Sequence, residues 1–252
     1  MDFIKINYTG RVKDAGVFDT TLEDVAKKEN ISDSRRVYKP LSVAVGEGQV
    51  IKGLDEALAG MKVGDKKTVT VEPERGYGAR SPALVKLVPV KYFRQQKLNP
   101  IPGLPVEVDG MRGKVQTVAG GRVRVDFNHE LAGRTLVFDV EVVEKAGSDT
   151  EKVSCLLERN FESAEGFDSE LAARKLTLKL PRKAFHDRNL LVRKASLAAE
   201  AFKFLGLSEV TFQETWENPK KEEKPEAKEK ARGDEEKPEG KQKPEGKKAV
   251  GK

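Results

Sequence analysis

The chain has 252 residues, of which 37% are hydrophobic and 35% are charged. This lean apolar content indicates a water-soluble protein in which part of the chain cannot bury itself. Its apolar runs fall short of the roughly 18 residues that span a bilayer, and residues 1–9 alternate polar and apolar side chains, unlike a signal peptide. A single cysteine, Cys155, excludes an internal disulfide and suits a reducing compartment. We therefore expect a cytoplasmic protein without membrane contact.

The net charge of +6 raises the question of nucleic-acid binding. About half of this excess falls within residues 219–252, where Lys and Arg are mixed with nearly as many Asp and Glu. A phosphate-binding face would concentrate basic residues without such compensation. The charge distribution therefore gives little support to a nucleic-acid-binding protein.

The first part of the chain is predicted to form an antiparallel sheet packed on one short helix, an α+β arrangement. Alternating apolar residues predict strands at 4–8, 41–45, 68–71 and 136–142. Residues 51–61 carry apolar side chains at helical spacing, and Gly60 and Gly64 bracket the turn that ends this helix.

A second helix is predicted over residues 21–30. Thr21 is its expected N-cap, and Asp24 lies in its first turn. Leu22, Val25 and Ala26 form its apolar stripe.

Residues 85–128 are predicted to form a small β-rich unit inserted within this first domain. Four prolines are spaced through a stretch that remains rich in Val, Leu and Ile. Residues 115–118 and 123–127 alternate as two strands, and Gly120-Gly121 between them predicts a tight hairpin turn.

After a hinge predicted at Ala146-Gly147-Ser148, residues 149–217 form a third unit of α+β type. A strand over 176–180 is ended by Pro181, and a helical stripe from Leu191 to Leu205 is followed by Gly206, which is placed to cap it. Residues 218–252 consist mainly of Lys, Glu, Pro and Gly, and this composition predicts disorder.

Conventional catalytic sets are missing from the sequence. Its two histidines, His129 and His186, lack a Ser, Cys or metal-ligand partner at a recognisable spacing. No glycine-rich phosphate loop follows a strand. We expect neither a cofactor nor a metal, and the chemistry must be of a kind that needs no nucleophile.

Six ordered motifs resemble those of the FKBP-type peptidyl-prolyl cis-trans isomerases, and they lie at residues 8–10, 18–19, 45–54, 60–65, 73–78 and 136–140. The segment 128–133, which follows the β-rich insertion, is similar to the SlyD-like branch with its insert-in-flap domain. The C-terminal unit resembles that of long archaeal members. The resemblance implies an isomerase domain formed by residues 1–84 and 129–145, with an inserted chaperone domain at 85–128.

The resemblance also implies an apolar pocket for a prolyl ring. Its walls would be Tyr8, Phe18, Val50, Ile51, Tyr77 and Phe138, with Leu41 nearby and Leu54 as the floor. In this arrangement the Ile51 backbone N–H and the Tyr77 hydroxyl hold substrate carbonyls, and Asp19 orients the pocket electrostatically. Many members have tryptophan where this chain has Leu54; the smaller floor still admits proline, but affinity for macrolide inhibitors is not carried over.

These residue types suit the rotation of a peptide bond, which must lose amide resonance against a barrier of roughly 18–20 kcal/mol. The planar amide is more polar than its twisted form, so an apolar, water-poor pocket favours the twisted form. Each 1.4 kcal/mol of that preference gives about tenfold in rate.

Structural interpretations compete with these roles. Phe18 or Phe138 alone would be core residues of a strand, and Asp19 alone a turn or capping residue. His129 is expected to order its loop through a hydrogen bond rather than act as a base. Leu131, in the same loop, is expected to contact the substrate.

The insertion carries more apolar residues than its small core requires: Val88, Val90, Tyr92, Phe93, Leu98, Ile101, Leu104, Val106 and Met111. An exposed remainder would bind unfolded or partly folded polypeptides that contain Xaa-Pro bonds. The alternative is that all of these residues are buried. SlyD-like proteins often add a His- and Cys-rich tail, and this chain's tail contains neither residue, so metal storage is not carried over.

Two other functions remain open. Arg112, Lys114, Arg122 and Arg124 form a basic hairpin that could contact nucleic acid, or could be only the solvated face of that hairpin. The chain could also be a binding-only chaperone with a degenerate pocket. Finally, Trp216, Phe212 and Leu205 could supply an apolar interface for homodimerisation through the C-terminal unit.

Overall fold

The computed structural model describes residues 1–216, so the disorder predicted for 218–252 lies outside the described residues. Its first sheet has five strands: β1 (Phe3–Val12), β2 (Val17–Thr20), β3 (Leu41–Ala44), β4 (Lys66–Val71) and β9 (Leu136–Lys145). The order is β2-β1-β9-β4, with β3 also paired to β1, and each pairing is antiparallel. The predicted antiparallel sheet is confirmed.

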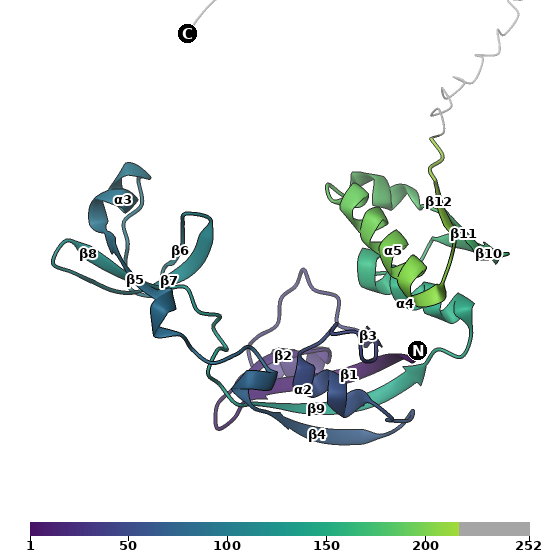
Figure 1. The fold of residues 1–252 in the computed structure, drawn as a ribbon, viewed down its shortest axis with the longest axis horizontal. Coiled ribbons are helices and arrows are strands. Elements are labelled where there is room, and N and C mark those ends of the chain that lie inside the picture. The colour runs from purple at the N-terminus through teal and green to yellow at the C-terminus, as the bar shows by residue number, and fades with distance from the viewer. Residues whose placement is uncertain (217–252) are drawn as a thin grey trace, which may run out of the picture. The chain divides into compact units, whose positions relative to one another are not determined.

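Helix α2 (Lys52–Leu58) covers one face of this sheet (Figure 1). Leu54 and Leu58 are 3% and 1% exposed, and they pack on strand residues such as Ile6 and Val71. Burying one such leucine contributes roughly 1.5–3 kcal/mol. The helix ends at Leu58, before the predicted Met61. Gly60 and Gly64 lie in the turn that follows and adopt φ values of +79° and +90° that favour glycine.

The predicted cap of the other helix is wrong. Helix α1 spans Glu23–Lys28, its N-cap is Leu22, and no side chain caps it. The Thr21 hydroxyl instead accepts a hydrogen bond from the Tyr8 N–H at 2.9 Å. Thr21 is therefore used to fix the entry of this helix to β1. Of the predicted apolar stripe, only Ala26 is buried.

The insertion, residues 85–128, forms its own four-stranded antiparallel sheet, in the order β5-β8-β7-β6. Its elements are β5 (Val85–Pro89), α3 (Val90–Gln95), β6 (Pro105–Val108), β7 (Met111–Ala119) and β8 (Arg122–Asp126). The predicted hairpin is confirmed, with Ala119 opposite Arg122 and with Gly120 and Gly121 at φ +55° and +72°. The sheet has a separate core, which contains Phe93, Val115 and Val125.

The C-terminal region, residues 149–216, contains α4 (Asp149–Phe161), β10 (Asp168–Ala172), β11 (Lys175–Lys179), α5 (Leu190–Leu205) and β12 (Glu209–Gln213). Its sheet has the order β10-β11-β12, and α5 is the crossover between the parallel strands β11 and β12. Gly206 caps α5 at φ +59°, as predicted.

The segment predicted as a hinge is instead tied to its neighbours. Ala146 is buried, and its N–H donates to the Phe3 carbonyl at 2.9 Å. Ser148 and Glu151 form a capping box that begins α4. The core of the C-terminal region also includes Phe3 and Ala44 of the first sheet. Among residues 1–216, no helix combines the length and the apolar character needed to cross a bilayer.

Candidate functional site

A cleft of about 480 Å³ opens between α2 and the first sheet. Nine of the ten residues predicted for the site line it, together with Gly48 and Gln49: Tyr8, Phe18, Asp19, Leu41, Val50, Ile51, Leu54, Tyr77 and Phe138. We call this the aromatic cleft. The tenth residue, Leu131, does not line it.

Strand pairing brings the aromatic residues together. Gly10 on β1 lies opposite Asp19 on β2 and opposite Phe138 on β9. A Cβ atom at Gly10 would come within 2.8 Å of both Phe18 and Phe138. Because glycine has no Cβ, the two rings can meet edge to face over the strand, with centroids 5.8 Å apart and an interplanar angle of 87°.

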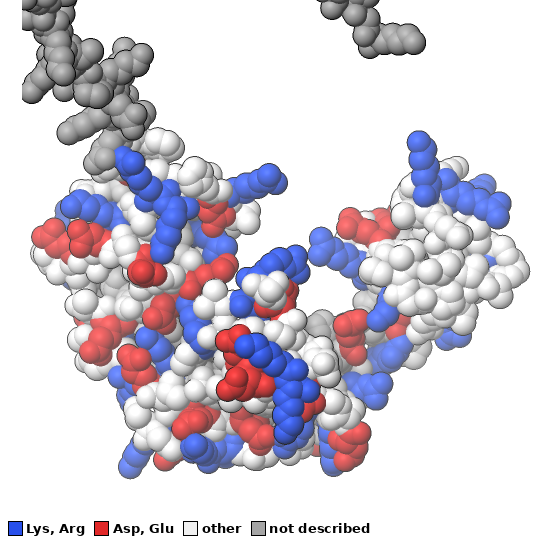
Figure 2. Space-filling view, turned by 180° about the vertical axis from the view of Figure 1, so that it is seen from behind, with Lys and Arg blue, Asp and Glu red and all other residues white. Residues whose placement is uncertain are grey.

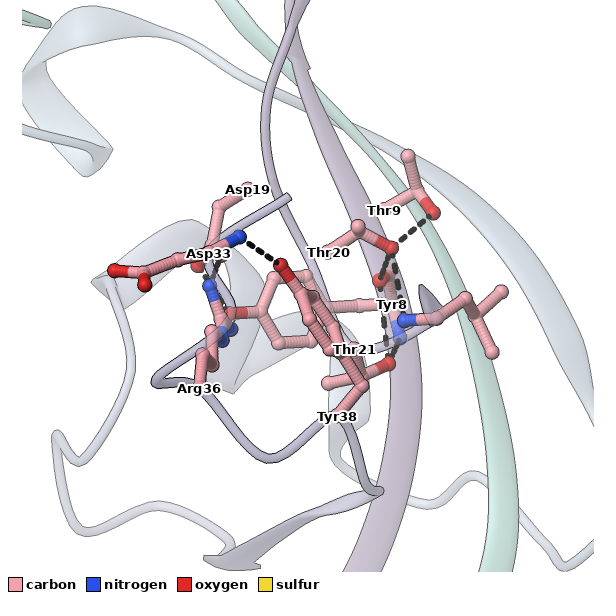
Figure 3. A network of polar contacts seen from close by, with 9 residues as sticks. Tyr8, Thr9, Asp19, Thr20, Thr21, Asp33, Arg36 and Tyr38 are labelled. Atoms are coloured by element: carbon pink, nitrogen blue, oxygen red, sulfur yellow. Dashed lines mark hydrogen bonds and ion pairs between the residues drawn. The ribbon is translucent and has the colours of Figure 1, made fainter. Parts of the chain in front are cut away.

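Asp19 holds a polar network at the rim of the aromatic cleft (Figure 3). The Tyr8 hydroxyl donates to one carboxylate oxygen, and Arg36 Nη1 donates to the other at 2.5 Å. The Arg36 guanidinium also lies over the Tyr38 ring, 5.4 Å from its centroid. Both oxygens of the Asp19 carboxylate therefore accept a hydrogen bond, and the bond from Arg36 is charge-assisted. These two bonds fix the position of the carboxylate.

Arg36 is a site residue that the sequence did not reveal. It lies in the loop between α1 and β3, 17 positions after Asp19. No motif marks that loop, and the adjacent Arg35 pairs instead with Asp33. Only the fold of the loop determines which of the two arginines contacts Asp19.

Both tyrosine hydroxyls stay protonated in this environment. Burial, the hydrogen bond to Asp19 and the charge of Asp19 raise the pKa of Tyr8 well above its ordinary value. Partial burial and the charge of Asp19 raise the pKa of Tyr77. The Tyr77 ring is stacked on His129, with centroids 4.1 Å apart. Tyr77 can therefore present an O–H donor from a fixed ring.

The loop before α2 offers a backbone donor to the same cleft. The Asp55 carboxylate, which is 7% exposed, accepts hydrogen bonds from the Gly46 and Gly48 N–H groups at 2.8 and 2.9 Å. These bonds fix the loop that leads to Ile51. Within the described part of the chain the Ile51 N–H has no hydrogen-bond acceptor, so it is available to a ligand.

Leu131 and His129 belong to the loop that follows the insertion. The His129 Nδ1 accepts the Leu131 N–H at 3.2 Å, so His129 orders this loop as predicted. Leu131 packs against the core of the first sheet and lines a second cleft, of about 560 Å³, together with Phe18, Arg112, Lys114 and His129. We call this the flap cleft. Phe18 lines both clefts, so they adjoin.

The arrangement is suited to binding rather than to bond cleavage. Its walls are largely aromatic and aliphatic, and the donors along them include the Ile51 N–H and the Tyr77 phenol. Across residues 1–216, no group of three His, Cys, Asp or Glu side chains is placed to hold a metal ion.

Comparisons with known proteins agree in direction. Residues 86–131 match the family model for the FKBP26 IF domain, and residues 149–217 match the model for the FKBP26 C-terminal domain. The short-type peptidyl-prolyl cis-trans isomerase of Methanocaldococcus jannaschii is 39% identical over 150 residues, which cover 60% of this chain and 95% of that protein. The FKBP-type 16 kDa isomerase of Escherichia coli is 34% identical over 131 residues, covering 50% of this chain and 86% of that protein. The SlyD isomerase of Haemophilus influenzae is 33% identical over 135 residues, covering 48% and 66%.

Proposed function

This chain belongs to the FKBP-type peptidyl-prolyl cis-trans isomerases, and from that membership we propose that the aromatic cleft is its active site and that the insertion holds unfolded polypeptide beside it. The chain is an isomerase that acts on polypeptides. The proposal assigns isomerisation to residues 1–84 and 129–145, chaperone binding to 85–128 and a further α+β domain to 149–217. The three separate sheets support this division.

The cleft suits a twisted imide better than a planar one. Phe18 and Phe138 surround the space where a prolyl ring would lie, and Leu54 closes it from below. Apolar walls exclude the water that stabilises the more polar planar amide. A preference of about 4 kcal/mol for the twisted form corresponds to a rate increase of roughly a thousandfold.

Two donors position the substrate in this proposal. The Ile51 N–H and the Tyr77 O–H each bind a carbonyl of the polypeptide, and neither group transfers a proton. Asp19, held by Tyr8 and Arg36, places a negative charge at the rim of the cleft. Because the pKa of Tyr77 is raised, its O–H form persists into the alkaline range. Catalysis then rests on orientation and on the apolar environment.

The insertion has an exposed apolar surface that its core does not use. Leu87, Leu98, Ile101 and Val118 are 60%, 41%, 55% and 40% exposed, whereas Val88, Phe93 and Val106 are buried. In Figure 2 the insertion, at the right, shows a broad face with few charged side chains. Strands β5 and β6 are the edges of its sheet, so extended chains can pair with their free backbone groups.

The flap cleft adjoins both elements. It is lined by Phe18 of the first sheet and by Pro105, Arg112 and Lys114 of the insertion. A polypeptide held on the insertion therefore has a route to the aromatic cleft, and its local concentration there rises. Leu131 contacts the substrate on this route rather than within the aromatic cleft.

The observation that carries the proposal is the meeting of Phe18, Tyr77, Phe138 and the unpaired Ile51 N–H in one cleft. The test follows refolding of a proline-limited protein, and in parallel isomerisation of a proline tetrapeptide. Tyr77→Ala should lower both rates by about tenfold or more, since it removes the donor and the ring. Replacing 85–128 with a short loop should slow protein refolding at least tenfold more than tetrapeptide exchange. Equal losses for both substrates would refute the division of labour.

Nucleic-acid binding by the hairpin has weaker support. Arg112 pairs with Glu107 at 3.7 Å, and Lys114 pairs with Glu130 at 3.2 Å. Val123 and Val125, which alternate with Arg122 and Arg124, are buried. This alternation is that of a strand with one solvated face. Retention on RNA that falls steeply with salt would favour this alternative.

Homodimerisation through the C-terminal region stays a prediction. Leu205 and Phe212 pack partly against that region's own core, and Trp216 is 76% exposed. The proposed interface therefore depends mainly on Trp216. A strictly monomeric mass in light scattering would remove it.

A further inference from the structure

A third cleft adjoins the aromatic cleft on the side of the C-terminal region. Its volume is about 510 Å³, and Tyr8 and Leu41 line both this cleft and the aromatic cleft. The rest of its lining comes from Thr21 and residues 36–42 of the first domain, from α4 and its C-cap Glu162, and from α5. We call it the Arg159 cleft.

The wall contributed by the C-terminal region is held firmly in place. Phe3 and Ala44 of the first sheet are 2% and 0% exposed within the core of that region. Glu158 of α4 pairs with Lys5 at 3.1 Å and accepts the Ser42 hydroxyl at 2.9 Å. These contacts combine apolar burial with a partly buried ion pair next to Leu41. The Arg159 cleft is therefore a feature of the packed structure rather than a chance gap.

The same interface reaches the other side of the aromatic cleft. Lys203 of α5 forms an ion pair with Glu47, whose side chain is only 17% exposed. Glu47 lies between Gly46 and Gly48, which Asp55 holds. The C-terminal region thus contacts Ser42, next to Leu41, and Glu47, in the loop that leads to Ile51.

Both basic and acidic side chains line the Arg159 cleft. Its three carboxylates are already paired: Glu158 with Lys5, Glu200 with Arg159 and Glu162 with Arg193. Arg159 donates its Nε to Glu200 at 2.8 Å, and its side chain is 30% exposed, which leaves its terminal amino groups for a ligand. Arg36 uses Nη1 for Asp19 and also lines the cleft. A guanidinium offers five N–H donors, so each arginine has donors left over. Their natural partners are carbonyl and carboxylate oxygens.

Resting on the proposed role of the aromatic cleft, we propose that the Arg159 cleft binds the stretch of substrate polypeptide next to the proline, and that Arg159 is a specificity-determining residue that contacts its carbonyl and carboxylate oxygens. Continuity through Tyr8 and Leu41 favours this occupant, because a chain with its proline in the aromatic cleft must leave past one of its rims. The C-terminal region then extends the reading of sequence beyond the proline.

The test compares two substrates, a tetrapeptide centred on proline and a peptide lengthened by six residues at each end. The measured quantity is the ratio of kcat/KM for the long peptide to kcat/KM for the tetrapeptide. Arg159→Ala should lower this ratio about tenfold, mainly through KM, because a charged hydrogen bond is lost. Arg188→Ala, an exposed arginine of the same region outside the cleft, should leave the ratio as it is. Two versions of the long peptide are compared, one with a glutamine among the added residues and one with a glutamate at the same position. The glutamate version should give the higher ratio with the native chain but not with Arg159→Ala.

A second measurement avoids reliance on the folding of a variant. Long peptides with a photo-crosslinking side chain in the added residues should label residues 149–161 or 190–205 of the native chain, as located by mass spectrometry. Labelling confined to the insertion or the aromatic cleft would overturn the proposal, as would an unchanged ratio for Arg159→Ala. If the native chain failed on the tetrapeptide itself, the role of the aromatic cleft would fall first.

Discussion

The aromatic cleft and the insertion both gather apolar side chains, but they fix them to different degrees. In the cleft, cross-strand pairing and the Asp19 network hold each ring, and Leu54 beneath them is 3% exposed. On the insertion, Leu87 and Ile101 are more than half exposed, and neither belongs to the core of the insertion. A fixed cleft can select one geometry of one bond, whereas an open surface can accept many sequences. In the proposed function, the aromatic cleft supplies selectivity and the insertion supplies capture.

The sharpest way to break this comparison is to unsettle the fixed rings. Gly10→Ala places a Cβ 2.8 Å from Phe18 and Phe138, so the rings must move. A displacement of about 1 Å costs roughly a hundredfold in rate, and we expect that loss in kcat/KM for a tetrapeptide. Gly16→Ala is the matched control, because nothing lies within 4 Å of its added Cβ. Full activity of Gly10→Ala would show that the cleft tolerates loose rings.

A smaller effect is expected from freeing Asp19. Arg36→Ala removes a charge-assisted hydrogen bond of 2.5 Å, and such bonds are worth about 1.5–3 kcal/mol. We expect kcat/KM for a tetrapeptide to fall about tenfold. Arg35→Ala is the control, because this neighbour pairs with Asp33 and its side chain is 88% exposed. If both variants behaved alike, the network around Asp19 would not matter to the reaction.

On the open surface each side chain should matter less. The double change Leu87→Ser with Ile101→Ser removes apolar area worth roughly 1 kcal/mol in binding, or about fivefold. Affinity for a permanently unfolded protein, measured by fluorescence anisotropy, should fall by that factor. Val63→Ser serves as the control, since Val63 lies outside the insertion and is 55% exposed, like Ile101. An unchanged affinity would move chaperone binding away from this face.

The smallest effect is expected from pH. Because partial burial and Asp19 raise the pKa of Tyr77, its O–H form persists above the ordinary tyrosine value of about 10. Tetrapeptide activity should therefore vary less than about twofold between pH 8 and pH 10, and fall only as the pH rises toward the raised value. Because folding raises the pKa of Tyr8 and of Tyr77, their protonated hydroxyls stabilise the fold at pH values below the ordinary tyrosine pKa. This stability is lost as the pH rises through the raised pKa values. A decline centred below pH 9 would contradict the assignment.

Local patterns predicted the elements whose own residues carry a regular period or a turn signal. Alternation at Ile4, Ile6 and Tyr8 predicted β1, and Gly120-Gly121 predicted the hairpin of the insertion. Helix α4 was not predicted, although Ser148 and Glu151 have the spacing of a capping box. Its apolar face is completed by Phe3 and Ala44, which lie more than a hundred residues earlier. Periodicity cannot reveal a core that is shared at such a distance.

The same distinction holds at the site. Motif resemblance pointed to nine residues that the structure gathers in one cleft, because the matching motif positions line the pocket in the family's fold. Arg36 and the displacement of Leu131 to the flap cleft depend on loop paths that no motif records. The Thr21 hydroxyl likewise accepts a hydrogen bond from the Tyr8 N–H of β1 instead of capping helix α1. This partner comes from the tertiary fold, which the local sequence pattern does not show.

The burial of Phe3 beside Leu197 and Ala201 has a consequence for synthesis on the ribosome. Strand β1 is made before its partners β2, β3 and β9, and Phe3 is covered by Leu197 and Ala201 only once α5 has been made. During synthesis β1 can therefore pair with β2 and β3 early, whereas the Phe3 side chain stays uncovered until α5 has left the exit tunnel. Until then the uncovered Phe3 is open to unwanted contacts with other apolar surfaces.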